Sequence, residues 1–197
     1  MAASYHHGDL RRALLDHAGS VLEEKGIGSL SLRDLARRAG VSATAPYHHF
    51  KGKADLVAAL GTDAMEQLDA ALAGPDHADP NARLRAMGVE YVMFAVSHPE
   101  RFRLAFRPEM GDPFTGVGAD GAMRGDDVLG FRQLAAVVRE IEPNEEQQVA
   151  LAIAAWGMVH GLASLFVDGP LRPLAEDLGR VRQMAEAAIA RMGLSTS

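Results

Sequence analysis

Apolar residues recur at helical spacing along most of this 197-residue chain, and no β-hairpin pattern interrupts them. Gly- and Pro-rich turns divide the pattern into separate segments. The helices that we expect cover about residues 9–25, 32–39, 43–50, 54–72, 81–97, 126–141, 144–168 and 174–192, with one more that opens at Pro99. The sequence therefore predicts an all-α fold of about nine helices.

Local capping signals set the bounds of the first three helices. Gly26 follows the first helix and can end it in the left-handed conformation. Ser31 stands three residues before Asp34, which is the spacing of a capping box at the start of the second helix. Gly40 ends that helix, and Ser42 is expected to cap the third. The pattern predicts helix, short turn, helix.

A break at residues 51–53 follows the third helix. We therefore expect a helix-turn-helix DNA-binding domain over residues 1–54. A helical ligand-binding and dimerisation domain is expected over residues 55–197. Within it, residues 108–125 contain five glycines and two prolines, and we expect a mobile loop there.

The segment 32–50 has the arrangement that places a second helix in the major groove of DNA. Small residues after Ser42 would let the backbone approach base edges, and Thr44 could read a base. A helix capped by Ser42 would also present free N–H groups and a positive dipole end to phosphate. Aromatic and basic side chains nearby could contact phosphate. The residues predicted to bind DNA are Ser31, Arg33, Ser42, Ala43, Thr44, Ala45, Tyr47, His48, His49 and Lys53.

Several motifs within residues 9–60 fit one known pattern: Ser31 to Gly40, Val41-Ser42, Tyr47, His49-Phe50, Lys53 and Leu56. Through them this segment resembles the N-terminal domain of the TetR family of transcriptional regulators. The C-terminal part is similar to one branch of that family, whose ligand domain carries Trp, His and Gly on one helix. Here these are Trp156, His160 and Gly161, preceded by the segment 98–102. The resemblance implies a DNA-binding domain joined to a dimerising ligand domain.

Pro46 departs from the family pattern, in which an apolar residue such as Leu is common. Its missing N–H would have made the first bond of the third helix, to the Ser42 carbonyl. We therefore expect this helix to start loosely or with a widened turn, which makes base contacts at positions 43–46 hard to carry over from the family.

The segment 149–167 is apolar except for His160 and Ser164, and its length could just span a bilayer. Its Ala and Gly content favours a helix buried on most sides instead. A helix with two apolar faces must be covered twice, once by its own domain and once by a partner. With the amphipathic helix 174–192, it would form a four-helix homodimer interface.

Aromatic and Met residues in the C-terminal part could line a pocket for a small apolar or amphipathic effector. The predicted ligand-binding residues are Met93, Phe94, Phe102, Phe106, Phe131, Trp156 and His160. Such residues at helical spacing also serve as ordinary core, and His160 could be a satisfied core histidine.

The net charge is −6, but residues 1–55 hold eight basic against six acidic residues, and the remainder holds 12 against 20.

The absence of cysteine excludes disulfides and thiolate metal sites, and it permits a cytoplasmic location. The N-terminus lacks the apolar core of a signal peptide. The glycine motif at 116–121 has no preceding strand, so we do not expect nucleotide binding. No catalytic, metal or cofactor motif is evident.

These observations predict a cytoplasmic DNA-binding regulator, not an enzyme, that represses transcription and is released from a pseudo-palindromic operator by a small molecule. Two alternatives stay open. One is a helical small-molecule-binding protein or enzyme with a vestigial DNA domain. The other is a dimeric regulator without a ligand, whose aromatic residues only fill the core.

Overall fold

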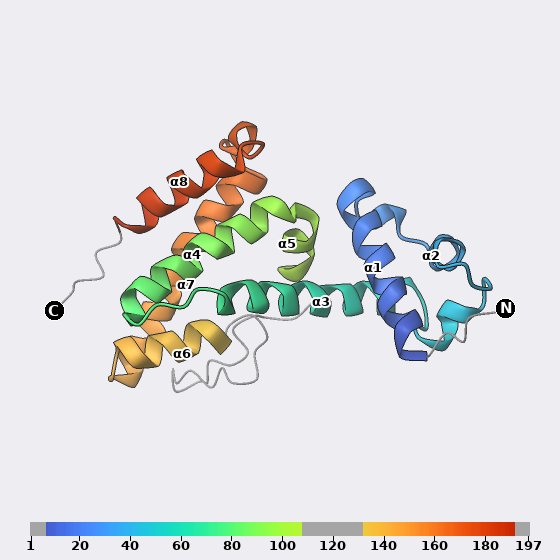
Figure 1. Ribbon diagram of the computed structural model, residues 1–197, viewed down its shortest axis with the longest axis horizontal. Helices are drawn as coiled ribbons and strands as arrows, with labels where there is room; N and C mark the ends of the chain where they lie inside the picture. Colours follow the sequence, from blue (N-terminus) through green and yellow to red (C-terminus); the bar gives the residue numbers. More distant parts are fainter. Residues whose placement is uncertain (1–6, 108–131, 192–197) are drawn as a thin grey trace. The chain divides into compact units, whose positions relative to one another are not determined.

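In the computed structural model, residues 7–107 and 132–191 are described, and they contain eight α-helices and no strand (Figure 1). The α-helices are α1 (His7–Lys25), α2 (Leu32–Arg38), α3 (Lys53–Ala73), α4 (Pro80–Ser97), α5 (Pro99–Ala105), α6 (Arg132–Ile141), α7 (Glu145–Val167) and α8 (Leu178–Ile189). Short 3-10 turns are η1 (Ile27–Ser29), η2 (Ala45–His48) and η5 (Arg172–Leu174). The predicted all-α fold is confirmed. The predicted loop over 108–125 lies outside the described residues.

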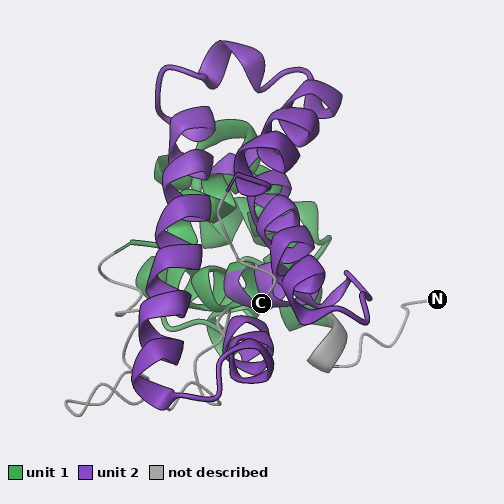
Figure 2. Cartoon of the chain, turned by 90° about the vertical axis from the view of Figure 1, so that its left-hand side faces the viewer, with its two compact units in different colours: residues 1–64, 100–110 green, residues 65–99, 111–197 purple. Residues whose placement is uncertain are grey.

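The chain divides into two compact units (Figure 2). Unit 1 comprises residues 1–64 and 100–110, and unit 2 comprises residues 65–99 and 111–197. The continuous helix α3 contributes to both. A functional boundary between residues 54 and 55 stays a prediction, since the division by contacts falls inside α3 and also assigns α5 to unit 1.

Glycine and serine set the helix ends of unit 1 as the sequence predicts. Gly26 has a φ of 72°, and its N–H donates to the Leu22 carbonyl at 2.8 Å, which ends α1. The Ser31 hydroxyl accepts from the Asp34 N–H at 3.4 Å and caps α2. Gly40 has a φ of 69° and follows α2. Glycine adopts this backbone region without strain, so the helix can end at both positions with little cost in conformational energy.

The core of unit 1 joins all of its helices through leucines and one phenylalanine. Its fully buried large side chains are Leu14, Leu22, Leu35, Phe50, Leu56, Leu60 and Leu104. They come from α1, α2, the segment after η2, α3 and α5. This packing fixes the short α2 and η2, which are too short to be stable alone.

Helix α4 is the centre of unit 2 and packs against α6, α7 and α8. Gly88 allows close approach of α7 and α8, because a Cβ there would lie 3.0 Å from Val159 of α7 and 3.2 Å from Ile189 of α8. Asp79, Asn144 and Asp177 cap α4, α7 and α8 through side-chain oxygens. Each cap satisfies backbone N–H groups that a helix start leaves unpaired.

Helix α7 is covered on one side within unit 2. The buried side carries Ala152, Ala155, Val159, Ala163, Phe166 and Val167. An exposed stripe carries Ala150, Ile153, Ala154, Gly157, Gly161 and Leu165. Among the described helices, α7 alone is long and apolar enough to cross a membrane, which the core helix of a globular protein also can be.

The inward face of α8 differs in part from the pattern in the sequence. Apolar residues at helical spacing over 174–192, among them Leu178, Val181 and Ala185, predict that face. Val181, Ala185 and Ile189 are buried, whereas Leu178 is 44% exposed. Asp177 starts the helix at Leu178, so the predicted start at residue 174 is wrong and that position lies in η5. Ile189, near the end of α8, lies against Gly88 of α4.

Candidate nucleic-acid interface and ligand site

The helix-turn-helix geometry is present in unit 1, where α2, a tight turn and η2 follow one another. The Val41 N–H donates to the Ala36 carbonyl at 3.0 Å and closes the turn behind Gly40. Pro46 within η2 and Phe50 just after it are buried, and the Arg11 guanidinium lies 5.6 Å from the centre of the Phe50 ring. The buried side chains thus hold the inner side of the segment after the turn, and its outer side faces solvent.

Pro46 tightens the segment after the turn, whereas the sequence predicted a loose or widened start. The predicted helix 43–50 is a four-residue 3-10 turn, η2. Pro46 cannot donate to the Ser42 carbonyl, which instead accepts from the Ala45 N–H at 3.1 Å, three residues along the chain. The Pro46 carbonyl then accepts from both His49 and Phe50, at 3.0 and 2.9 Å.

Ser42 does not cap this segment, so that prediction is wrong. Thr44 stands at the cap position of η2 and makes no side-chain cap bond. The Ser42 hydroxyl lies 3.1 Å from the Thr44 hydroxyl. A 3-10 turn of four residues has little dipole to offer phosphate, so DNA contacts here would rest on side chains.

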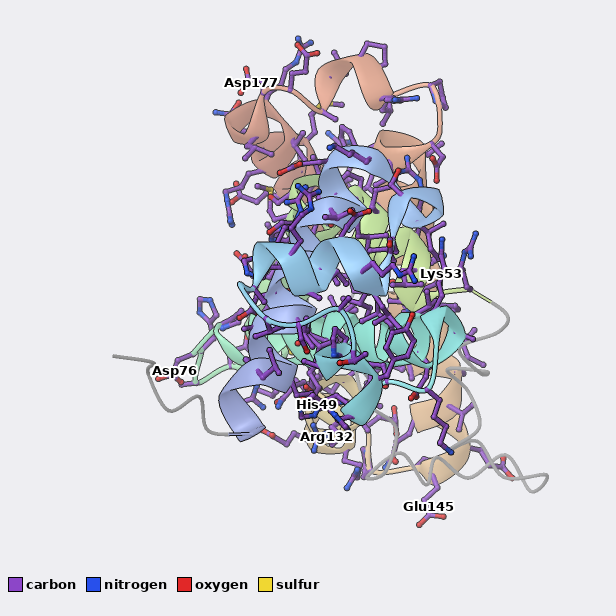
Figure 3. All side chains as sticks on the ribbon, turned by 90° about the vertical axis from the view of Figure 1, so that its right-hand side faces the viewer. His49, Lys53, Asp76, Arg132, Glu145 and Asp177 are labelled. Atoms are coloured by element: carbon purple, nitrogen blue, oxygen red, sulfur yellow. The ribbon has the colours of Figure 1, made fainter. Side chains whose placement is uncertain are left out.

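The predicted DNA-binding residues form a mostly exposed set in unit 1. Arg33, Ser42, Ala43, Thr44, Tyr47, His48 and Lys53 are exposed, and Ser31, Ala45 and His49 are half-buried. Lys53 Nζ donates to the Gly28 carbonyl at 2.9 Å, so the start of α3 lies beside the turn that leads into α2. His49 and Lys53 can be followed in Figure 3. The tyrosine ring of Tyr47, 51% exposed, is the largest apolar surface in the set.

Unit 2 contains a cluster of buried Tyr91 with half-buried Trp156 and His160, which the sequence predicted only in part. The hydroxyl of Tyr91 on α4 lies 2.8 Å from Nδ1 of His160 on α7. The Trp156 and His160 ring centres are 4.8 Å apart, one helical turn from each other. Tyr91 was absent from the prediction. Its spacing on α4 looks like an ordinary core position, and only tertiary contact brings it to His160.

Burial keeps both members of the Tyr91–His160 pair neutral. It raises the pKa of the Tyr91 hydroxyl and lowers the pKa of His160. A neutral phenol is a better donor than a neutral imidazole N–H, and an imidazole nitrogen is the better acceptor. We therefore assign the bond as Tyr91 O–H donating to Nδ1, which leaves the His160 proton on Nε2.

The remaining predicted ligand-binding residues do not gather in one place within a single unit. Phe94 is buried on α4 and its ring lies 5.3 Å from that of His98, while Met93 is half-buried. Phe102 on α5 and Phe106, the residue after α5, belong to unit 1, and their tilted rings have centres 5.1 Å apart. Phe131 lies outside the described residues.

An open groove of about 600 Å³ lies elsewhere in unit 2, between the end of α3, α4 and α8. Arg85, Glu90, Arg182 and Glu186 line it, with Val89 and Ile189 on its floor. Arg182 is paired with Glu90 at 2.8 Å. None of the predicted ligand-binding residues lines this groove. In the part of the chain that the structure describes, no group of three His, Asp or Glu side chains could hold a metal ion.

Two family models match the chain. Residues 14–60 match the bacterial regulatory proteins of the tetR family, and residues 84–192 match the tetracyclin repressor-like C-terminal domain. Over 63 residues the chain is 41% identical to the HTH-type transcriptional regulator BetI of Cronobacter sakazakii, a match that spans 32% of this chain and 31% of BetI.

Solved structures resemble the chain over nearly its whole length. A protein of unknown function from Rhodococcus sp. RHA1 is 31% identical, with a TM-score of 0.65 over 96% of this chain and all of the other. A tetR-family regulator from Streptomyces coelicolor, 22% identical, has a TM-score of 0.62 over 94% and 82% of the two chains. A TetR variant from Acinetobacter baumannii in complex with minocycline, 19% identical, has a TM-score of 0.57 over 90% and 92%. The last two show the fold.

The helix-turn-helix of unit 1, the all-helical unit 2 and the match of both family models agree with one another. Together they show that the chain belongs to the TetR family of transcriptional regulators, which are DNA-binding proteins and not enzymes.

Proposed function

We propose that this regulator is a cytoplasmic homodimeric repressor that binds a pseudo-palindromic operator and is released from it by a small apolar or amphipathic molecule. The observation that carries the DNA-binding part is a set of exposed residues next to buried Pro46 and Phe50. The set comprises Ser42, Ala43, Thr44, Tyr47 and His48. Small side chains beside a hydroxyl permit close approach to base edges.

The residues of this interface divide into two roles. Tyr47 and Lys53 are proposed to contact phosphate, which positions the protein without reading sequence. Thr44 is proposed to read a base through its hydroxyl or methyl group, since it is exposed and central in the segment. Ser31 and Arg33, at the start of α2, would contact the backbone of the same half-site.

The experiment is selection of bound duplexes from a random DNA pool, followed by affinity measurements at increasing salt. We expect a two-fold symmetric site with half-sites about 34–36 Å apart or a multiple of that, and a steep loss of affinity with salt. If no pool member is enriched over the others, the chain is not a sequence-specific regulator.

The exposed stripe of α7 supports dimerisation through α7 and α8. Six exposed residues without a polar side chain at helical spacing leave an uncovered apolar face, and small residues at 150, 154, 157 and 161 allow close helix packing. A second copy would cover this face by two-fold symmetry. The spacing of the two DNA-reading segments would then depend on the structure of both subunits.

The proposed dimer interface is tested by making the same Ala→Glu change at two exposed helical positions, one on the stripe and one away from it. Ala154→Glu places a charge on the α7 stripe, and Ala136→Glu places the same charge on the exposed side of α6. We expect Ala154→Glu to give monomers in light scattering and Ala136→Glu to stay dimeric. A dimeric Ala154→Glu protein would show that the interface lies elsewhere.

The effector site is proposed at the cluster of Tyr91, Trp156 and His160. These side chains combine a flat aromatic face with a neutral histidine, which suits a molecule with an apolar body and one polar group. The effector would shift the equilibrium between conformations of the dimer. It would favour a conformation in which the distance between the two DNA-reading segments does not fit the operator. The ligand-independent regulator remains the second candidate, because Tyr91 already satisfies Nδ1 of His160.

Trp156 is the single tryptophan of the chain, so its fluorescence reports on this cluster. A metabolite library is screened for compounds that shift Trp156 emission and release the selected duplex. Linkage requires that the duplex weakens effector binding by the same factor. His160→Ala should reduce effector affinity and leave DNA affinity intact. A variant that melts earlier but responds normally to the effector would show that His160 is a core histidine and not a ligand contact.

A further inference from the structure

Two hydroxyl groups lie together in the segment that follows the turn of unit 1. The Ser42 and Thr44 hydroxyl oxygens are 3.1 Å apart and share a hydrogen bond. Both side chains are exposed, and so is Ala43 between them. A hydroxyl that is bonded to its neighbour no longer turns freely, so the pair presents its remaining hydrogen-bonding groups in a defined arrangement.

Pro46 gives the chain the turn that brings these hydroxyls together. Residues two apart in an α-helix do not face each other, so an α-helix over this segment would separate Ser42 from Thr44. Pro46 has no N–H for the Ser42 carbonyl, which accepts instead from the Ala45 N–H at 3.1 Å. The chain therefore turns within four residues. Because Pro46 is buried, one end of this tight turn is held in place by packing.

The bonded pair offers one donor and one acceptor side by side. Each hydroxyl has one proton and two lone pairs, and one proton of the pair is used in the bond between the two oxygens. Whichever oxygen donates that bond, the other oxygen keeps its own proton for an outside acceptor. The donating oxygen keeps its lone pairs for an outside donor. The pair therefore combines a donor and an acceptor whose oxygens are 3.1 Å apart.

Adenine carries the matching groups on its major-groove edge. Its N7 atom accepts and its N6 amino group donates, whereas guanine shows two acceptors and would need two donors. Thymine offers only an acceptor, and cytosine offers only a donor. The A·T pair also carries the thymine methyl group, which suits contact with the exposed methyl group of Ala43. Among the four bases, adenine alone uses both groups of the hydroxyl pair.

We propose that Ser42 and Thr44 together read one adenine in each half-site of the operator. One hydroxyl donates to N7, and the other accepts from the N6 amino group. The inference rests on the proposed function, in which Thr44 reads a base, and it adds the identity of that base and the participation of Ser42. Pro46 is a positioning residue, because it sets the turn from a buried position.

Modified bases test the pair on the unaltered full-length protein. In the duplex selected from the random pool, each adenine is replaced in turn, at both symmetry-related positions. The replacement is 7-deazaadenine, which lacks the N7 acceptor, or purine, which lacks the N6 amino group. At one position in the half-site, each replacement should weaken binding about tenfold, the effect of one good base contact.

Substitutions then assign that position to the two hydroxyls. Ser42→Ala and Thr44→Val each remove one member of the pair, and in each variant at least one of the two replacements should no longer weaken binding. Thr44→Ser keeps both hydroxyls and should respond to both replacements as the wild type does. Ser20→Ala is the matched control, because it removes an exposed serine hydroxyl that bonds to the Asp16 carbonyl within α1. It should also respond as the wild type does.

Pro46→Leu tests the role of the turn. It restores the backbone N–H and allows an α-helical start, which would separate Ser42 from Thr44. A repeated selection with this variant should lose the adenine preference, while binding to unrelated duplexes at low salt is retained. If Pro46 only stabilised the fold, specific and unspecific binding would fall together.

An enriched duplex that tolerates both replacements at every adenine would overturn the inference and leave the proposed function standing. Equal sensitivity of the wild type, Ser42→Ala and Thr44→Val at the critical position would also overturn it. A guanine at the position whose preference these two variants change would do the same. If no duplex is enriched, the proposed function itself fails, and the inference fails with it.

Discussion

The two units place polar and apolar groups in opposite ways. Unit 1 buries the carboxylate of Asp63 between Arg12 and Arg101 and exposes a polar and aromatic set after its turn. Unit 2 contains a neutral pair of buried Tyr91 and half-buried His160, and it exposes an apolar stripe on α7. The exposed face of unit 1 is compatible with water and with a charged polymer. The exposed face of unit 2 is compatible with another protein surface.

This contrast explains why the acidic net charge of the chain does not argue against DNA binding. The excess of acidic residues lies after residue 55, while residues 1–55 carry a balance of +2, from eight basic and six acidic residues. The charge that DNA meets is local, since fields from exposed charges decay within about 10 Å at 0.1 M salt.

The largest effect is expected from removing the aromatic core residue of one unit at a time. Phe50→Ala in unit 1 and Phe166→Ala in unit 2 each empty a fully buried site, and each should cost about 3–5 kcal/mol of unfolding free energy. Phe50→Ala should abolish DNA binding and leave the dimer intact, and Phe166→Ala should weaken the dimer first. Urea unfolding, light scattering and duplex binding measure this. Loss of both properties in both variants would show that the units do not differ in this way.

The next effect concerns the pair buried in unit 2. Tyr91→Phe removes the hydroxyl bonded to His160 and leaves a buried nitrogen without that donor, which should cost about 1–3 kcal/mol. Tyr47→Phe makes the same change at an exposed position of unit 1 and should alter stability by less than about 0.5 kcal/mol. Thermal melting compares the two. Equal melting temperatures would mean that the buried bond contributes nothing.

A smaller effect is expected from single contacts at the DNA interface. Lys53→Ala should weaken binding to selected and unrelated duplexes alike and reduce the salt dependence by about one phosphate contact. Thr44→Val keeps the shape but loses the hydroxyl, and it should change the selected sequence instead. Affinity at several salt concentrations and a repeated selection distinguish these roles. An unchanged selected site for Thr44→Val would remove it from the base-reading residues.

The smallest effect is the pH dependence due to His160. Burial lowers its pKa in the folded state, so the unfolded chain binds the proton more readily. Stability from this residue is fully present above the ordinary histidine pKa of about 6.5 and falls as the pH drops from there towards the lower folded value. In unfolding titrations, His160→Gln should flatten this part of the wild-type curve. An identical slope in both proteins would contradict the assignment.

The helix ends of unit 1 were predictable because their causes are local. Gly26, Ser31 and Gly40 act on residues within one helical turn, so the sequence alone indicates where α1 and α2 begin or end. The sequence indicates that Pro46 disturbs the start of the third helix. It does not indicate whether the turn there becomes wider or tighter. Whether the freed Ser42 carbonyl finds a donor three residues away or stays open depends on how Phe50 and Pro46 are packed below.

The sequence by itself determined the helical class, the order of the elements, the turn between α2 and η2, and the residues that resemble the TetR family. Only the tertiary structure decided that Tyr91 reaches His160, that Asp63 joins Arg12 and Arg101, and that α5 belongs to unit 1. Hydrophobic periodicity reports which side of a helix faces inward. Periodicity does not report which other helix that side packs against, because any apolar face can pack against any other. The pairing of helices depends on the packing of the whole unit.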